Sequence, residues 1–296
     1  MRPWLLRFQP YTLHLVPYTI GIKNPVVWDR LSARKITMRF EILHFTNVAG
    51  QKLSARIDLP ANKPPVAYAL FAHCFTCSKN IKAASHISRA LTAEGIAVLR
   101  FDFTGLGESE GDFGDTSFSS NVDDLVSAAE YMGNHFDGPK VLIGHSLGGS
   151  AVLQADARIP SSLAVITIAA PADPGHVKLA LGDSNEIIER QGEANVDLAG
   201  RTFKIKKQFL EDLESVRMQQ TIQNLNRALL IFHAPTDGVV GIDNAAQIFM
   251  TARHPKSFIS LDNADHLLMN PKDAHYVGAL IAAWASKYIE TNPENS

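Results

Sequence analysis

From about residue 38 onward, the hydrophobic pattern of the chain alternates between two kinds of segment. Short apolar runs, typical of buried strands, are followed by longer stretches in which apolar residues recur at helical spacing. The clearest of these stretches is 121–136, where Val122, Leu125 and Ala129 fall on one stripe. Alternating strands and helices predict a mainly parallel sheet that is covered by helices on both faces.

The pattern predicts eight strands, of which the first two form an antiparallel pair around a turn at 47–50. The expected strands span residues 39–45, 52–59, 66–72, 96–103, 140–143, 163–169, 228–233 and 257–261. Helices are expected at about 80–94, 121–136, directly after residue 146, at 243–251, and in a last stretch that ends near residue 288. The chain therefore has an α/β fold.

Residues of about 171–227 interrupt this alternation and are more charged than their flanks. Val196 and Leu198, then Phe203 and Ile205, alternate around a glycine, which predicts a hairpin that leads into a helix. The insertion leaves the sheet at the carboxyl ends of the strands, where the sites of such sheets lie. We therefore expect a small lid, with surface decoration as the alternative.

The expected domain organisation is one α/β domain at 38–296, which includes this lid, preceded by an N-terminal extension at 1–37. The extension is poorly periodic, and Met38 is a candidate for the true start of translation. Prolines and polar residues interrupt its apolar residues, so that neither a signal peptide nor a membrane span is expected there.

The net charge limits the kinds of binding partner that are expected, and the cysteine content bears on the cellular compartment. The net charge is −2 and the sequence pI about 6.6, which provides no basic face for nucleic acid or anionic membranes. A small, nearly neutral molecule is the expected partner, and the oligomeric state is not indicated. Two cysteines, Cys74 and Cys77, are too close together to staple distant segments, as secreted domains do, and this favours a cytoplasmic protein.

The segment Gly144-His145-Ser146-Leu147-Gly148 directly follows a buried strand and precedes small, helix-compatible residues. A G-x-S-x-G sequence in this setting predicts a sharp turn that exposes a nucleophilic serine. Serine needs a base within hydrogen-bond reach to act as a nucleophile at neutral pH. Ser146 is therefore the candidate nucleophile.

Two later loops supply the partners that Ser146 would need. Asp237 lies in the loop after strand 228–233, and His266 lies in the loop after strand 257–261. An imidazole can take the serine proton and return it to the leaving group, while a carboxylate orients the imidazole. We expect His266 to be the base and Asp237 the acid, with Asp243 as the alternative acid. Serine, acid and histidine then follow the chain order of α/β hydrolases.

Backbone donors for the developing oxyanion are expected after the nucleophile and after the third strand. These positions give the N–H groups of Leu147 and Phe75, with Cys74 as the alternative to Phe75. The nearby cysteines lack the further ligands that zinc needs, so no metal is expected. They are interpreted as packing residues, and a reversible disulfide remains open.

The glycine-rich segment 102–111 lacks both the G-x-G-x-x-G spacing and the lysine of a phosphate-binding loop. We interpret it as a turn that shapes the pocket wall. No cofactor is therefore expected.

Together these motifs resemble the α/β-hydrolase superfamily over residues 38–288. The phrases at 71–79 and 235–243 resemble, more narrowly, bacterial hydrolases that are often fused to an OsmC-type peroxidase domain. One departure is Cys74, because many relatives have glycine after the histidine that is His73 here, and a Cβ there affects how the loop aims its donor. The resemblance implies the eight-stranded α/β-hydrolase fold and hydrolysis of small acyl or aromatic esters through an acyl-enzyme.

Our leading hypothesis is a serine carboxylesterase that uses Ser146, His266 and Asp237 and takes a small-molecule ester. Thioesterase and small peptidase are the alternatives within the same chemistry. Non-catalytic ligand binding, or redox sensing by Cys74 and Cys77, is the alternative of a different class.

Overall fold

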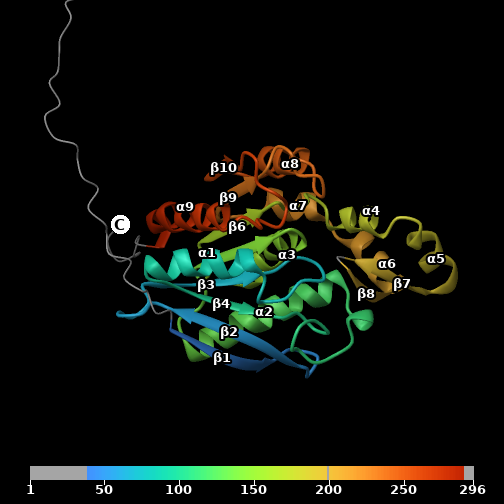
Figure 1. The fold of residues 1–296 in the computed structure, drawn as a ribbon, viewed down its shortest axis with the longest axis horizontal. Coiled ribbons are helices and arrows are strands. Elements are labelled where there is room, and N and C mark those ends of the chain that lie inside the picture. The colour runs from blue at the N-terminus through green and yellow to red at the C-terminus, as the bar shows by residue number, and fades with distance from the viewer. Residues whose placement is uncertain (1–38, 199, 290–296) are drawn as a thin grey trace, which may run out of the picture. The chain divides into compact units, whose positions relative to one another are not determined.

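The computed structural model describes residues 39–198 and 200–289. The expected N-terminal extension at 1–37 lies outside the described residues. The described chain forms an eight-stranded sheet in the order β1-β2-β4-β3-β5-β6-β9-β10 (Figure 1). The strands are β1 Arg39–Thr46, β2 Lys52–Leu59, β3 Ala67–Ala72, β4 Ile96–Phe101, β5 Val141–His145, β6 Ala164–Ile168, β9 Ala228–His233 and β10 Lys256–Ser260.

Antiparallel pairing is confined to one edge of the sheet, where β1 pairs with β2 and β2 with β4. The other neighbouring strands are parallel. Strands β4, β5, β6 and β9 are buried along their whole length, which explains their continuous apolar runs. The expected α/β-hydrolase sheet, mainly parallel with an antiparallel opening pair, is confirmed.

Helices cover both faces of the sheet, and successive strand residues face opposite layers. Helices α1 (Lys82–Ala93) and α9 (Pro271–Ile289) pack against one another on one face, where they bury Phe71 of β3. On the other face, α2 (Phe118–His135), α3 (Leu147–Ala155) and α8 (Asp243–Thr251) share a core with Leu70. Figure 1 shows these two layers on either side of the strands.

Helix α2 begins earlier than its apolar stripe predicts. Its first residue is Phe118, whereas the hydrophobic pattern placed the start at 121. Ser117 and Ser120 form a capping box, in which the Ser117 side chain accepts from the Ser120 N–H and the Ser120 hydroxyl accepts from the Ser117 N–H. This polar cap fixes the start of the helix.

The residues expected to form a lid, 171–227, fold into short elements between β6 and β9. The expected hairpin is present, with β7 (Glu193–Leu198) antiparallel to β8 (Arg201–Lys206). The other elements of the insertion are η3 Pro174–His176, α4 Val177–Leu181, α5 Ser184–Gln191, α6 Lys207–Ser215 and α7 Met218–Gln223. Most of them gather beside the main sheet (Figure 1).

Among the described residues, no helix has both the length and the apolar character needed to cross a membrane.

The first prediction concerns the stability of the core that α2 shares with the sheet. Leu125 of α2 is fully buried, so Leu125→Ala leaves a cavity and should lower the free energy of unfolding by about 2–5 kcal/mol. Leu179→Ala in α4 is the matched control, because that side chain is 75 % exposed and its loss should cost no more than about 0.5 kcal/mol. Urea unfolding at pH 7 measures both, and equal losses would contradict this packing.

Candidate active site

Ser146 occupies a strained turn between β5 and α3. Its φ of 56° is in the left-handed region, which side chains other than glycine rarely adopt. The turn is held by the Ser146 N–H, which donates to the Ile168 carbonyl at the end of β6 (2.8 Å). The expected elbow is therefore present, and the strain places the serine hydroxyl at the carboxyl end of the sheet.

The two glycines of the elbow are required by space. A Cβ on Gly144 would lie 2.2 Å from the Gly148 carbonyl oxygen. A Cβ on Gly148 would lie 2.5 Å from the carbonyl oxygens of Ala72 and His73, where β3 ends. The glycines thus let the start of α3 approach both β5 and β3 closely.

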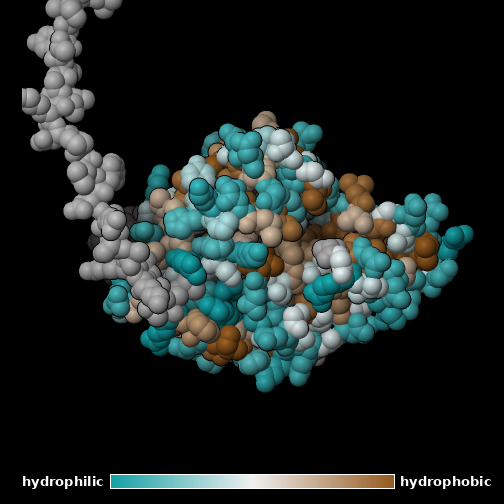
Figure 2. All heavy atoms as spheres, in the orientation of Figure 1, coloured by the Kyte–Doolittle hydropathy of each residue, from teal (hydrophilic) through white to brown (hydrophobic). Residues whose placement is uncertain are grey.

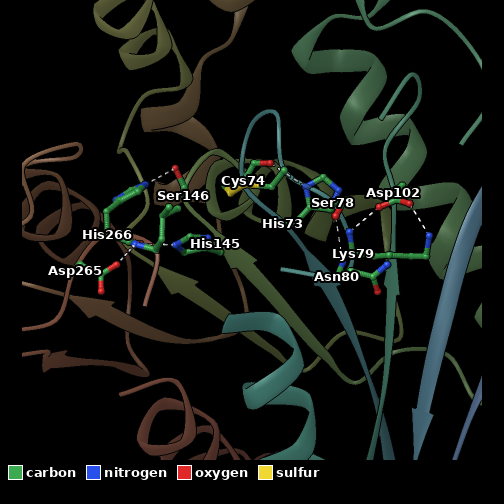
Figure 3. The surroundings of a disulfide bond; sticks show 12 residues. His73, Cys74, Ser78, Lys79, Asn80, Asp102, His145, Ser146, Asp265 and His266 are labelled. Carbon is green, nitrogen blue, oxygen red and sulfur yellow. Dashed lines mark hydrogen bonds and ion pairs between the residues drawn. A yellow bond between two sulfur atoms is a disulfide. The ribbon is translucent and has the colours of Figure 1, made fainter. Parts of the chain in front are cut away.

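Ser146, His266 and Asp237 are brought together from three separate loops. His266 Nε2 lies 3.0 Å from Ser146 Oγ, and His266 Nδ1 lies 2.8 Å from Asp237 Oδ2 (Figure 3 shows the first contact). In the neutral imidazole, Nδ1–H donates to the carboxylate while Nε2 accepts from the serine hydroxyl. This arrangement allows proton transfer from Ser146 to His266.

Asp237 is held as a carboxylate acceptor by its own loop. Its Oδ1 accepts from the N–H groups of Val239 (2.8 Å) and Val240 (3.0 Å). Burial by itself raises the pKa of Asp237, but the hydrogen bonds from His266 and from these two N–H groups outweigh it and lower the pKa. Asp243, the alternative acid, is instead the first residue of α8.

The expected oxyanion donors, Leu147 and Phe75, come from two different parts of the chain. Leu147 is the first residue of α3, so its N–H is one of the helix-terminal donors that have no partner within the helix. Phe75 lies in the segment between β3 and α1. Both residues line one small pocket of about 10 Å³.

A disulfide joins Cys74 and Cys77 around Phe75 (Figure 3). The four-residue turn brings the two Cα atoms to 5.4 Å, and the Cys77 N–H donates to the Cys74 carbonyl (3.1 Å). Our interpretation of these cysteines as two packing thiols is therefore corrected, because the turn places their sulfur atoms within bonding reach. Within the described residues, no cluster of His, Cys, Asp or Glu could hold a metal ion.

Sequence analysis missed a buried ion pair behind this segment. Lys79 is 1 % exposed, and its Nζ lies 2.6 Å from both Asp102 Oδ2 and Glu108 Oε2. Asp102 also accepts from the Lys79 backbone N–H through Oδ1 (2.6 Å). Figure 3 shows Lys79 and Asp102 in contact, a few residues beyond the disulfide. A lysine and an aspartate beside buried strands were the available signal, since buried charges must pair.

His145, the elbow residue that precedes Ser146, is buried next to His266. Its Nε2–H donates to the His266 carbonyl (2.7 Å), as Figure 3 shows. Burial, and then the neighbouring imidazole of His266, lower the pKa of His145 to about 4. His145 is therefore neutral at pH 7.

Aromatic side chains connect the Phe75 segment, residues 73–79, with the insertion. The ring of Phe75 lies 5.3 Å from that of Phe113 and 5.4 Å from that of Phe209 in α6. Phe113 in turn contacts Phe203 of β8 at 5.1 Å. In Figure 2, apolar atoms are visible where the insertion joins the rest of the domain, and its outer end is largely hydrophilic.

Comparison with known proteins agrees with this fold. Residues 69–280 match the Alpha/beta hydrolase family, and the chain belongs to that family. It is 52 % identical to an esterase domain from a Rhodothermus marinus protein, with 85 % of this chain and all of that chain covered and a TM-score of 0.70. Est1E from Butyrivibrio proteoclasticus, solved with ferulic acid, is 21 % identical over 83 % of this chain and 99 % of its own, with a TM-score of 0.72, and shares the fold.

Two curated relatives are more distant. The chain is 26 % identical to mouse palmitoyl-protein thioesterase ABHD10, a mitochondrial protein, over 61 % of this chain and 62 % of the relative. It is also 26 % identical to the uncharacterised protein YfhR of Salmonella typhimurium, over 69 % of this chain and 66 % of the relative. The match therefore spans less than two thirds of each curated relative.

The buried neutral His145 predicts a loss of stability in acid. The unfolded chain takes up a proton near the ordinary histidine pKa of 6.5, whereas folded His145 does so only near pH 4. The unfolded state thus binds more protons as the pH falls through this window, and between pH 7 and pH 5 this one group should remove about 2 kcal/mol of the free energy of unfolding.

Urea unfolding of the wild type and of His145→Gln at pH 7 and pH 5 measures this contribution, because glutamine does not titrate there. The loss between the two pH values should be smaller in the variant by about 2 kcal/mol. Equal losses in the two proteins would contradict a depressed His145 pKa.

Proposed function

We propose that this protein is a serine carboxylesterase in which Ser146 is the nucleophile, His266 the general base and Asp237 the orienting acid. The observation that carries the proposal is the unbroken series of contacts from Ser146 Oγ to His266 Nε2 (3.0 Å) and from His266 Nδ1 to Asp237 Oδ2 (2.8 Å). A half-buried serine in a strained turn beside a base has the arrangement that nucleophilic catalysis requires.

The chemistry proceeds in two halves. Ser146 Oγ attacks the ester carbonyl carbon while its proton passes to His266 Nε2, and the carbonyl oxygen becomes an oxyanion. His266 then gives that proton to the departing alkoxide, which leaves as the alcohol. A water, deprotonated by His266, attacks the acyl-enzyme, and the acid is released as Ser146 recovers its proton.

Two backbone donors stabilise the oxyanion in this proposal, Leu147 N–H and Phe75 N–H. The first lies at the positive end of the α3 dipole, which favours negative charge. The second lies within the segment that the disulfide and the Lys79–Asp102 pair hold at both ends. Removal of one such donor typically costs about a hundredfold or more in turnover.

We further propose that the acyl group is small or aromatic. Aromatic side chains, including Phe113 and Phe118, line the pocket beside Phe75 and Leu147, and flat apolar walls of this kind suit a small or aromatic acyl group. Leu267, which follows His266, and Val239, in the Asp237 loop, expose apolar side chains. The 52 % identity to an esterase domain supports an ester in preference to other bonds.

A thioesterase is the second candidate, because the mouse relative carries that activity in its name. The same series of contacts can cleave thioesters and, in a small peptidase, amides, since the three reactions differ in the leaving group. Parallel assays on acetyl esters, acetyl thioesters and acetyl anilides separate them.

The insertion at about 171–227 is proposed to act as the lid of this site. Phe209 of α6 contacts Phe75, and His176 of η3 donates to the Val239 carbonyl in the Asp237 loop (2.9 Å). The insertion therefore contacts both the segment around Phe75 and the loop that contains Asp237. Movement of these short elements would open or cover the site.

Three wider proposals rest on the sequence. Kinship with bacterial hydrolases fused to OsmC-type domains rests on the phrases at 71–79 and 235–243. The domain boundary near residue 38 rests on where strand-like alternation begins. A cytoplasmic location remains a prediction, and the Cys74–Cys77 bond spans a local turn, unlike the bonds of a secreted disulfide framework.

Replacement of the nucleophile tests the function. Ser146→Ala should lower kcat for p-nitrophenyl acetate by at least about a thousandfold, because the hydroxyl that forms the acyl-enzyme is lost. Release of p-nitrophenol measures turnover, and a fluorophosphonate probe followed by mass spectrometry should label Ser146 in the wild type.

Ser286→Ala is the matched control, since that hydroxyl lies in α9 and donates only to the Ala283 carbonyl. It should keep the wild-type rate. A wild-type protein with neither turnover nor label would instead favour the non-catalytic binding or redox-sensing module.

A further inference from the structure

Two buried histidines outside the proposed triad end the strands that precede the nucleophile and the acid. His145 is the last residue of β5 and directly precedes Ser146, and His233 is the last residue of β9, before the Asp237 loop. Their exposed fractions are 1 % and 0 %. Histidine is rarely so fully buried unless its polar atoms are used.

Each of these histidines donates one hydrogen bond to a backbone carbonyl in a loop of the triad. His145 Nε2 lies 2.7 Å from the His266 carbonyl oxygen, and His233 Nε2 lies 2.7 Å from the Val240 carbonyl oxygen. A carbonyl oxygen only accepts, so Nε2 carries the hydrogen in both rings. In each ring Nδ1 is buried and has no hydrogen-bond partner among the described residues.

The two carbonyls belong to the loops that contain the two partners of the His266–Asp237 hydrogen bond. The His266 carbonyl belongs to the proposed base itself. Val240 closes the loop whose N–H groups hold Asp237 Oδ1, the same carboxylate whose Oδ2 meets His266 Nδ1. The last residues of β5 and β9 thus each hold the loop of one partner of the His266–Asp237 hydrogen bond. In each of these histidines Nε2 makes the contact and Nδ1 makes none among the described residues.

We propose that His145 and His233 are positioning residues, which hold the His266 loop and the Asp237 loop in register with the sheet so that His266 Nε2 faces Ser146. This inference rests on the proposed function. His73, the third buried histidine nearby, differs because its Nδ1 contacts the carbonyl of its own neighbour, Cys74 (2.8 Å), so that this hydrogen bond stays within its own loop.

Packing alone does not explain why histidine, and not an apolar residue, occupies these two buried positions. Leucine would fill similar volumes without burying an unpaired nitrogen, which costs free energy in an apolar interior. A displacement of about 1 Å at a reacting group can cost a hundredfold in rate. A gain in positioning is therefore a physical reason for burying histidine here in spite of the unpaired Nδ1.

The test compares variants that keep or remove the donor. His145→Gln and His233→Gln retain an N–H donor, whereas His145→Leu and His233→Leu leave the loop carbonyls without one. We expect each leucine variant to lower kcat for p-nitrophenyl acetate about tenfold to a hundredfold with KM within about threefold, and each glutamine variant to stay within about fivefold of wild type. The double leucine variant should lose less than the product of the single losses, because both act on one hydrogen bond.

A matched control and a spectroscopic readout separate positioning from folding. His135→Leu removes an exposed histidine contact with the Tyr131 carbonyl in α2 and should keep the wild-type rate. The low-field proton resonance of the His266 Nδ1–H bonded to Asp237 should shift in the leucine variants and persist in the glutamine variants. This resonance needs no turnover, and thermal unfolding of each variant shows whether it is folded.

The possible results are distinguishable. Folded leucine variants with wild-type kcat and an unshifted resonance, or glutamine variants that lose as much as leucine, would overturn the positioning role while the esterase function stands. Should leucine fail to fold at either site, the glutamine variants and His145→Met decide the matter by the same two readouts. A wild type without turnover or Ser146 labelling would remove the proposed function, and the positioning role would fall with it.

Discussion

The close approach of the start of α3 to the ends of β3 and β5 is the constraint on which the rest of the site depends. Only glycine fits at 144 and 148, because a Cβ at either position would lie within 2.5 Å of backbone oxygens. This approach forces Ser146 into its left-handed conformation and brings Leu147 N–H beside the segment that contains Phe75. The positions of the proposed nucleophile and of the proposed oxyanion donors thus depend on one packing contact of the backbone.

The loops around the elbow are held by polar groups that the fold buries. Asp102 accepts from both the backbone and the side chain of Lys79, which fixes the far end of the disulfide segment, and Gly107 is required beside it because a Cβ there would lie 2.2 Å from Asp102 Oδ2. His145 and His233 contact the loops that contain His266 and Asp237. Buried polar contacts of this kind cost free energy unless they are satisfied, so they define one arrangement sharply.

The insertion gives the scaffold its particular character. Its hairpin and helix α6 share a core with α2 and α3 through Val196, Phe203 and Phe209, so it is packed on the domain and is more than a surface decoration. Through Phe209 it also contacts Phe75, one of the proposed oxyanion donors. Part of the wall around the proposed site therefore belongs to this insertion.

Much of this protein follows from the sequence by itself. The apolar runs predicted the strands and the parallel sheet, because a strand buried on both faces has no other composition. The G-x-S-x-G segment and the loops after 228–233 and 257–261 indicated Ser146, Asp237 and His266, because the carboxyl ends of parallel strands meet at one edge. The apolar periodicity predicted the helix bounds less well where a polar cap sets the first residue, as at the start of α2.

The tertiary structure decided what depends on contacts between segments distant in the chain. Lys79 meets Asp102 and Glu108 across two loops, and His145 meets the His266 carbonyl across 121 positions, so no local pattern marks them. The cysteines were judged by their spacing, yet the turn around Phe75 sets their sulfur atoms together. Sequence periodicity reports which face of an element is buried, whereas a hydrogen bond or a disulfide depends on where two elements finally meet.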